Sequence, residues 1–341
     1  MRQSFRTQSA WRGLAPVLAL ACLAMPAVAS GPDRSPDVTA RTDERFQWVT
    51  LGTMGGPMPA ADRHQPANLL TDGQAAYLID AGDGAASEMA STGVFFPMLR
   101  AVWISHIHFD HIGGLFALLG LRVQTRTTTP LIIYGPPGMT AIVDKLIDAE
   151  RPGAGLGFGV PGEVPIDPAA GISVVEVDDG SLIRIDGFTV RVARNCHYGF
   201  PPGSAMDERF RSLSFRFDLP GRSIVYTGDT GPCPAVDTLA EGADLLVSEM
   251  IDIDDTIARV RRHSPDLPAA ELARIEEHLR TQHLTPADIG ALAAAAHVGA
   301  VAITHIASGG DPEALASGRY VREVRERYSG PVTIARDGAR F

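Results

Sequence analysis

The six residues from His106 to His111 place three imidazoles and a carboxylate within one short turn, because the run reads His-Ile-His-Phe-Asp-His. Neutral imidazole nitrogens and carboxylate oxygens are the ligands that Zn²⁺, Mn²⁺ and Fe²⁺ accept. The apolar segment from Leu99 to Ile104 precedes the run and predicts a buried strand, whereas Gly113, Gly114 and an apolar stretch follow it. We therefore predict a metal site on a strand-to-helix loop, where α/β enzymes commonly keep their chemistry.

The run resembles the H-x-H-x-D-H signature of the metallo-β-lactamase superfamily. The remaining ligands of that family then occur in order, as His197, Asp229 and His305, each at the end of an apolar, β-branched segment. Convergence of several strand ends on one edge of a sandwich would bring these distant residues together. The resemblance extends over about residues 46–341 and implies an α/β fold, the αββα sandwich, in which two mixed β-sheets are flanked by helices.

Carried over position by position, the resemblance implies a dinuclear metal centre. The proposed ligands form one set of three for each ion, with a bridging carboxylate between them: His106, His108 and His197; Asp110, His111 and His305; and Asp229. Two cations lower the pKa of water and polarise a carbonyl, phosphoryl or sulfuryl oxygen, so no Ser or Cys nucleophile is required. Asp110 could also orient the attacking hydroxide. Zn²⁺ is the expected metal, with Mn²⁺ and Fe²⁺ as alternatives.

The opening of the domain, in residues 49–57, 65–70 and 77–82, resembles the ribonuclease Z and arylsulfatase-like branch. In ribonuclease Z, a glutamate after the bridging-aspartate strand and a histidine near the last ligand assist departure of the leaving group. Glu249 and His283 occupy those places, and a carboxylate beside an imidazole would raise its pKa and prepare it as a general acid. Alternatively, Glu249 caps the next segment or pairs with an arginine, and His283 caps the helix that starts near Pro286.

Two segments depart from ribonuclease Z. That family carries a Gly- and Lys-rich arm that grips tRNA, whereas residues 151–161 are rich in Gly and Pro and nearly uncharged. This segment is either a mobile flap, whose Leu156 and Phe158 suit an apolar substrate, or a solvated loop without a ligand role. A second insertion, from Asp252 to Gln282, contains a predicted helix at about Pro268 to Leu279 that we expect to lie over the site as a lid.

The other histidines and the cysteines receive structural interpretations. The histidines outside the motifs are expected on helix surfaces, for His278 and His297, or at the rim of the pocket, for His64 and His263. Cys196 and Cys233 could pair in an oxidising compartment. We favour free, partly buried thiols instead.

The N-terminus has the pattern of a secretory signal. Three arginines precede the apolar residues 14–24, and Ala27, Val28 and Ala29 supply the small residues of a cleavage site. We therefore predict a signal peptide in residues 1–29, a flexible linker in residues 30–45 and one hydrolase domain in residues 46–341. An uncleaved anchor and a lipid-modified Cys22 are the alternatives.

Charge and export together constrain the partners. Removal of residues 1–29 takes away three arginines and no acids, so the formal net charge changes from −10 to −13. An acidic surface repels polyanions, and the sequence has no Lys/Arg-rich stretch with interleaved aromatics that could follow a phosphate backbone. We expect a periplasmic or secreted protein that acts on a small-molecule ester, binds no nucleic acid and keeps no stable membrane span after cleavage. A homodimer remains open.

The sequence therefore predicts an exported dinuclear metal-dependent hydrolase that cleaves a small phosphodiester or an arylsulfate ester. Hydrolysis of a lactone or a β-lactam is the alternative, because Tyr198 or Asn195 could supply the oxyanion donor that acyl chemistry needs. A metal-binding protein without turnover is the second alternative.

Overall fold

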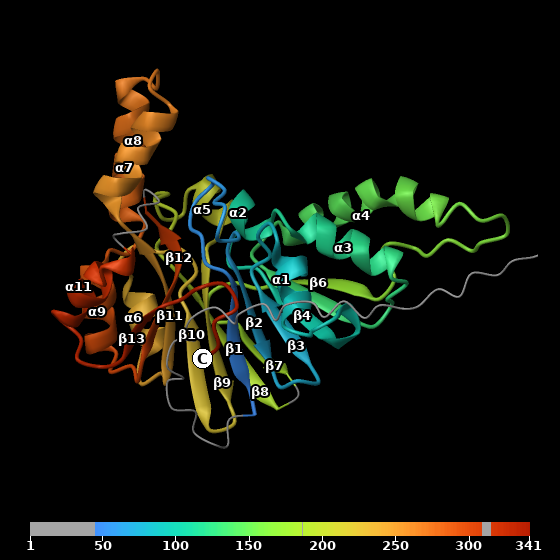
Figure 1. The fold of residues 1–341 in the computed structure, drawn as a ribbon, viewed down its shortest axis with the longest axis horizontal. Helices are drawn as coiled ribbons and strands as arrows, with labels where there is room; N and C mark the ends of the chain where they lie inside the picture. The colour runs from blue at the N-terminus through green and yellow to red at the C-terminus, as the bar shows by residue number, and fades with distance from the viewer. Residues whose placement is uncertain (1–44, 186, 309–314) are drawn as a thin grey trace, which may run out of the picture. The chain divides into compact units, whose positions relative to one another are not determined.

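Two β-sheets lie face to face at the centre of the computed structural model, with helices on their outer faces (Figure 1). The structure describes residues 45–185, 187–308 and 315–341. The predicted signal peptide, Cys22 and the predicted linker up to residue 44 lie outside the described residues. No helix in the described part of the chain is both long and apolar enough to span a membrane.

The first sheet has six strands in sequence order, of which β3 to β6 are mutually parallel. Its strands are β1 (Gln47–Gly52), β2 (Ala67–Thr71), β3 (Ala76–Ile79), β4 (Leu99–Trp103), β5 (Leu131–Gly135) and β6 (Ile172–Glu176). β1, β2 and β3 pair antiparallel, so the sheet is mixed.

The second sheet has seven strands in the order β13-β12-β11-β10-β9-β8-β7. Its strands are β7 (Leu182–Ile185), β8 (Phe188–Arg194), β9 (Leu213–Leu219), β10 (Arg222–Tyr226), β11 (Leu245–Ile251), β12 (Val301–Ala307) and β13 (Val332–Ile334). β10 to β13 are parallel and β7 to β10 antiparallel, so this sheet is mixed as well. The chain passes from the first sheet to the second between β6 and β7.

The helices complete the outer layers, and short ones carry parts of the loops above the sheets. They are α1 (Ala85–Ser91), η1 (Phe96–Met98), α2 (Phe109–Ile112), α3 (Leu115–Gln124), α4 (Met139–Leu156), α5 (Ala205–Arg209), α6 (Pro234–Ala240), α7 (Ile253–His263), α8 (Ala269–Thr281), α9 (Pro286–Ala295) and α11 (Arg319–Arg325). Residues of α1, α3 and α4 pack on the first sheet, and residues of α6, α9 and α11 pack on the second. The predicted αββα sandwich is therefore confirmed.

Alternation along β4 shows how one strand serves two hydrophobic layers. Trp103 points toward the second sheet, where its ring lies 5.6 Å from Phe215, whereas its neighbour Val102 packs under the helices. Successive side chains of a strand point to opposite faces, so β4, which is covered on both faces, is apolar except at the exposed Arg100. Complete burial of a side chain such as Phe215 stabilises the fold by about 1.5 to 3 kcal/mol.

The prediction of a flap in residues 151–161 is wrong for the first half of that segment. Residues 151–156 form the last turns of α4, even though Pro152 lies inside that helix. Leu156 and Phe158 are exposed, and neither lines the cavity described below. Figure 1 shows this end of α4 pointing away from the α7–α8 hairpin. The segment therefore offers no apolar contact to a substrate in that cavity.

The predicted helix in the second insertion is confirmed as α8, and α7 precedes it. The two helices pack on each other and form a hairpin that projects from the second sheet (Figure 1). The side chain of Asp252 caps α7 by accepting a hydrogen bond from the amide of Asp255, at 3.1 Å. We call residues 253–281 the hairpin.

Cys196 and Cys233 form a disulfide, so the preference for free thiols is wrong. Cys196 follows β8, and Cys233 is the N-cap residue just before α6. Their Cα atoms are 5.5 Å apart. The two positions are 37 residues apart in the chain, and only the packing of α6 against β8 brings them together.

Replacing both cysteines with serine is expected to lower the free energy of unfolding by about 3 to 4 kcal/mol, because a cross-link over such a loop restricts the unfolded chain. Urea unfolding of the metal-loaded protein, followed by circular dichroism, measures the difference. The wild-type protein in reductant should unfold at the same urea concentration as the variant. An oxidised wild-type protein no more stable than the variant would contradict this bridge.

Candidate metal centre

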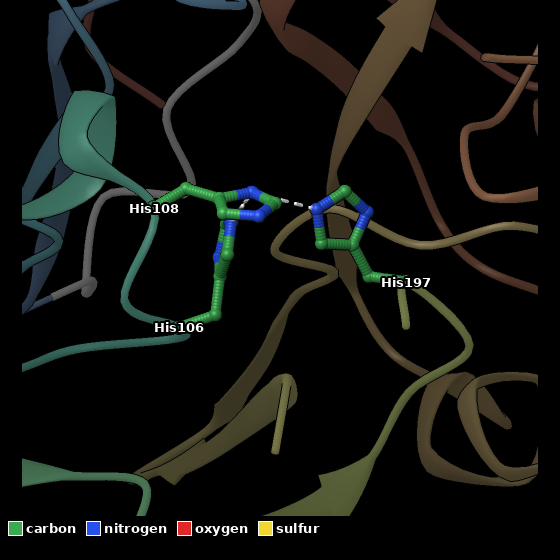
Figure 2. A group of neighbouring side chains, drawn as sticks. All are labelled: His106, His108 and His197. Carbon is green, nitrogen blue, oxygen red and sulfur yellow. Dashed lines mark hydrogen bonds between the residues drawn. The ribbon is translucent and has the colours of Figure 1, made fainter. Parts of the chain in front are cut away.

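Three imidazoles converge beside the ends of two strands, one from each sheet. His106 and His108 lie on the loop between β4 and α2, and His197 lies on the loop after β8 (Figure 2). The Nδ1 atom of His108 is 3.0 Å from Nε2 of His106 and 3.0 Å from Nε2 of His197. Three imidazole nitrogens that face one point provide the donor set of a borderline divalent cation. The structure thus brings together the first predicted set.

The second predicted set also converges. The Oδ2 atom of Asp110 lies 3.6 Å from Nε2 of His111 and 3.5 Å from Nε2 of His305. Asp110 and His111 lie on α2, whereas His305 comes from β12 and has a φ of 41°. This left-handed conformation is uncommon for a residue other than glycine and is typical of residues held in place at functional sites.

Asp229 connects the two sets through its two carboxylate oxygens. Its Oδ1 atom lies 3.3 Å from Nε2 of His111 and 3.2 Å from Nε2 of His305. Its Oδ2 atom lies 3.9 Å from Nε2 of His106 and 3.9 Å from Nε2 of His197. One carboxylate therefore faces both groups of imidazoles, which is the geometry of a bridging ligand.

Hydrogen bonds behind the rings fix which nitrogen faces the centre. Nδ1 of His111 lies 2.8 Å from Oδ2 of Asp80, and Nδ1 of His197 lies 3.0 Å from the carbonyl oxygen of Gln282. Carboxylate and carbonyl oxygens only accept, so these Nδ1 atoms donate, and in the neutral ring Nε2 keeps its lone pair. Hydrogen bonds of this kind orient metal-binding histidines.

The unpaired atoms at the centre fit divalent cations. Nε2 of His111, Nε2 of His305 and Oδ1 of Asp229 are buried and have no hydrogen-bond partner among the described residues. Buried polar atoms without partners are costly and call for an explanation, such as an ion. Their donor types, imidazole nitrogen and carboxylate oxygen, are those that Zn²⁺ accepts.

The electrostatics of the second set favour an ionised carboxylate. Burial would raise the pKa of Asp110, but His111 and His305 outweigh it and lower that pKa to about 2. Burial would likewise lower the pKa of His305, but Asp229 and Asp110 raise it to about 10. A cation bound here would replace the proton on the imidazole and keep the carboxylates ionised.

Glu249 and His283 form the predicted pair beside this centre. Oε2 of Glu249 lies 2.7 Å from Nδ1 of His283, and Oε1 accepts a hydrogen bond from the amide of Thr230 at 2.5 Å. Burial would lower the pKa of His283, but Glu249 outweighs it and raises that pKa. The capping alternative for His283 is excluded because the side chain of Thr285 caps α9.

His278 belongs to the site, so its interpretation as a helix-surface residue is wrong. Its Nε2 lies 3.4 Å from Nε2 of His283, and its Nδ1 lies 2.6 Å from Oε1 of Gln282. The packing of α8 over the strand ends turns this face of the helix inward. His297 is exposed as predicted, but it lies in the turn after α9 and not on a helix.

Asp80 is the main residue that sequence reasoning missed. It follows β3, has a φ of 58° and accepts hydrogen bonds from Ser105 and from the hydroxyl of Tyr226, besides the contact with His111. Asp80 therefore orients a ligand without facing the centre itself. Its position at a strand end, in Ile-Asp-Ala-Gly, was the signal available in the sequence.

A cavity of about 780 Å³ opens above the centre. The hairpin forms one wall, with Val260, His263, Ile275 and Leu279, so the predicted placement of the insertion over the site is confirmed. His263 thus lies at the cavity as predicted. His64 does not line it, because its ring lies 3.1 Å from the carboxylate of Asp337.

The two residues considered as oxyanion donors differ in availability. The side-chain amide of Asn195 is buried and donates to Ser214 at 3.3 Å and to the carbonyl oxygen of Thr227 at 3.1 Å. Both of its donors are therefore committed to the fold. The ring of Tyr198 lies beside His106 and His108, and burial raises its pKa.

Comparisons with known proteins agree with this geometry. The family model described as "Beta-lactamase superfamily domain" matches residues 76–306. Ribonuclease Z of Mycobacterium marinum is 32% identical over 260 residues, which cover 75% of this chain and 85% of that protein. Ribonuclease Z of Mycobacterium sp. (strain KMS) is 36% identical over 208 residues, which cover 60% of this chain and 69% of that protein.

Two solved structures share the fold. The metallo-β-lactamase fold protein YhfI of Bacillus subtilis has a TM-score of 0.61 at 21% identity and covers 87% of this chain and 98% of its own. The short form of human tRNase Z has a TM-score of 0.58 at 19% identity and covers 86% of this chain and 98% of its own. The chain therefore belongs to the metallo-β-lactamase superfamily and is a metal-dependent hydrolase that resembles ribonuclease Z.

Proposed function

We propose that this protein is an exported hydrolase that uses two divalent metal ions to cleave a small phosphodiester or an arylsulfate ester. The observation that carries the proposal is the position of Asp229, whose two carboxylate oxygens face two separate groups of imidazoles. A carboxylate that served one ion would not need both oxygens aligned in this way. Zn²⁺ is the proposed metal, because each group is rich in imidazole.

The side chains of the site have separable roles in this reaction. Two divalent cations would activate a water molecule and polarise the phosphoryl or sulfuryl oxygen of the substrate. Asp110, ionised and partly exposed at the floor of the cavity, accepts a hydrogen bond from the attacking water and orients it. His283 lines the same cavity and donates its proton to the leaving oxygen, while Glu249 holds the ring through Nδ1.

The cavity favours a small ester with an apolar body. Pro57, Met58 and Phe109 line it together with Val260 and Leu279 of the hairpin. The formal net charge of the chain is −10, which opposes binding of a polyanion. The relatives are named ribonuclease Z, so RNA is the competing substrate and belongs in the same assay.

Export is supported by two observations that are independent of each other. The N-terminal pattern is that of a signal peptide, and Cys196 forms a disulfide with Cys233. Structural disulfides persist in the periplasm and outside the cell and are rare in the cytosol.

A single substrate panel tests the proposal. Purified protein with measured metal content is assayed on bis-p-nitrophenyl phosphate, p-nitrophenyl sulfate, an acyl lactone, nitrocefin and a precursor tRNA. We expect the phosphate or the sulfate ester to be the preferred substrate, with activity lost in chelator and restored by Zn²⁺. Preference for the lactone, nitrocefin or the tRNA would overturn the substrate class, and no turnover with two metals bound would overturn the enzymatic role.

Replacing Asp229 with alanine is expected to abolish turnover and to reduce metal content, because both groups of imidazoles lose their shared carboxylate. Metal analysis of dialysed protein together with the ester assay measures both effects. His297→Ala is the matched control, since His297 is exposed and does not line the cavity. Two tightly bound metals in the Asp229→Ala variant would contradict the bridging role.

Replacing His283 with alanine is expected to leave the metal content unchanged and to slow esters with poor leaving groups by about 10²- to 10⁴-fold. Esters of p-nitrophenol should be slowed much less, because that leaving group departs without a proton. Rates for a series of aryl phosphodiesters, plotted against the pKa of the leaving phenol, give the comparison. Equal losses across the series would remove His283 from the role of general acid.

A further inference from the structure

Arg259, on α7, is the one Lys or Arg side chain among the described residues that line the cavity. Three apolar side chains of the hairpin, Val260, Ile275 and Leu279, line the same cavity. The side chain of Arg259 is partly buried, and a charge that loses part of its hydration is favoured by an anionic partner.

The base of α7 is fixed to the strand that carries His305. The amide of Asp252 donates to the carbonyl oxygen of Ala307 at 2.8 Å, and the hydroxyl of Thr256 donates to the same oxygen at 3.1 Å. Ala307 is the last residue of β12. Arg259 therefore has a defined position relative to the metal centre, although it belongs to an insertion.

The guanidinium is only partly engaged. Its Nη1 atom donates to the carbonyl oxygen of Ser308 at 3.3 Å, and Arg259 makes no ion pair with any of the described residues. A guanidinium carries five N–H donors in a planar fork that fits two anionic oxygens at once. As far as the described residues go, its other donors can serve a ligand in the cavity.

We propose that Arg259 is a specificity-determining residue that binds an anionic group, a carboxylate or a phosphate, on the part of the substrate remote from the bond that is cleaved. The carbonyl oxygen that Arg259 contacts belongs to Ser308, three residues beyond His305 in the chain, so the guanidinium would meet a group of the substrate other than the one at the metal centre. This inference rests on the proposed hydrolase function. It narrows the substrate to an ester with an apolar body and a second anionic group.

The test compares two p-nitrophenyl phosphodiesters that share the leaving group and differ at the remote end. One is the diester of hydroxyhexanoate, and the other is the same diester with the carboxylate methylated. We expect the wild-type enzyme to favour the carboxylate by about 10- to 100-fold in kcat/KM, mainly through KM. A third diester with a terminal phosphate shows which anion is preferred.

Variants of Arg259 then test whether this residue causes the preference for the carboxylate diester. Arg259→Gln should remove this preference by lowering kcat/KM for the carboxylate diester much more than kcat/KM for the methylated diester, and Arg259→Lys should retain part of the preference. Arg261→Gln is the matched control, because Arg261 is an exposed residue of the same helix that does not line the cavity. Equal losses on both diesters in Arg259→Gln, or no preference in the wild-type enzyme, would overturn the proposal.

Binding measurements separate this proposal from the proposed function. Titration calorimetry of the metal-loaded protein with the phosphonate analogues of the two diesters needs no turnover. Tighter binding of the carboxylate analogue, lost in Arg259→Gln, supports Arg259 even if neither diester is hydrolysed, a result that would count against the phosphodiesterase function alone. Equal binding of both analogues by the wild-type protein would overturn the role of Arg259.

Discussion

The two oxygens of the Asp229 carboxylate face two groups of buried imidazoles, and the positions of the other site residues are defined by that arrangement. A buried carboxylate is costly unless its charge is paired. Each surrounding imidazole must therefore present one particular ring nitrogen toward it. The fold provides this through contacts behind the rings, from Asp80 to His111 and from the backbone of Gln282 to His197. Atoms left without a hydrogen bond at the centre are then the natural ligands of cations.

The sandwich supplies the rigidity that such a centre needs. The proposed ligands lie at or just beyond the ends of β4, β8, β10 and β12. These strands belong to two sheets that pack on each other through a layer of aromatic side chains. The disulfide adds a second restraint, because Cys196 adjoins His197 and ties this loop to α6. Catalytic geometry has to be held closely, and sites built on rigid elements achieve this better than sites on free loops.

In the proposed reaction, chemistry and selectivity reside in different parts of the chain. The proposed metal ligands lie at or near strand ends, whereas the hairpin adds Val260, Ile275, Leu279 and the guanidinium of Arg259 to the lining of the cavity. His278 joins the two parts, because it belongs to α8 and contacts His283. A family fold can therefore keep its reaction while an insertion changes what it accepts, which is why fold alone does not identify a substrate.

The sequence by itself determined the fold class and identified the side chains that converge at the centre, with the Glu249–His283 pair, because these depend on local patterns: clustered imidazoles and apolar runs that end at polar residues. Only the tertiary structure decided that Cys196 bonds to Cys233, that Asp80 orients His111, that His278 faces inward and that residues 151–156 continue a helix. Each of the first three is a contact between segments far apart in sequence or a choice of helix face. Local patterns mark a polar residue at a strand end, such as Asp80, but not the partner that it contacts. The role proposed for Arg259 could not be predicted from the sequence for the same reason, because it depends on the cavity that α7 lines.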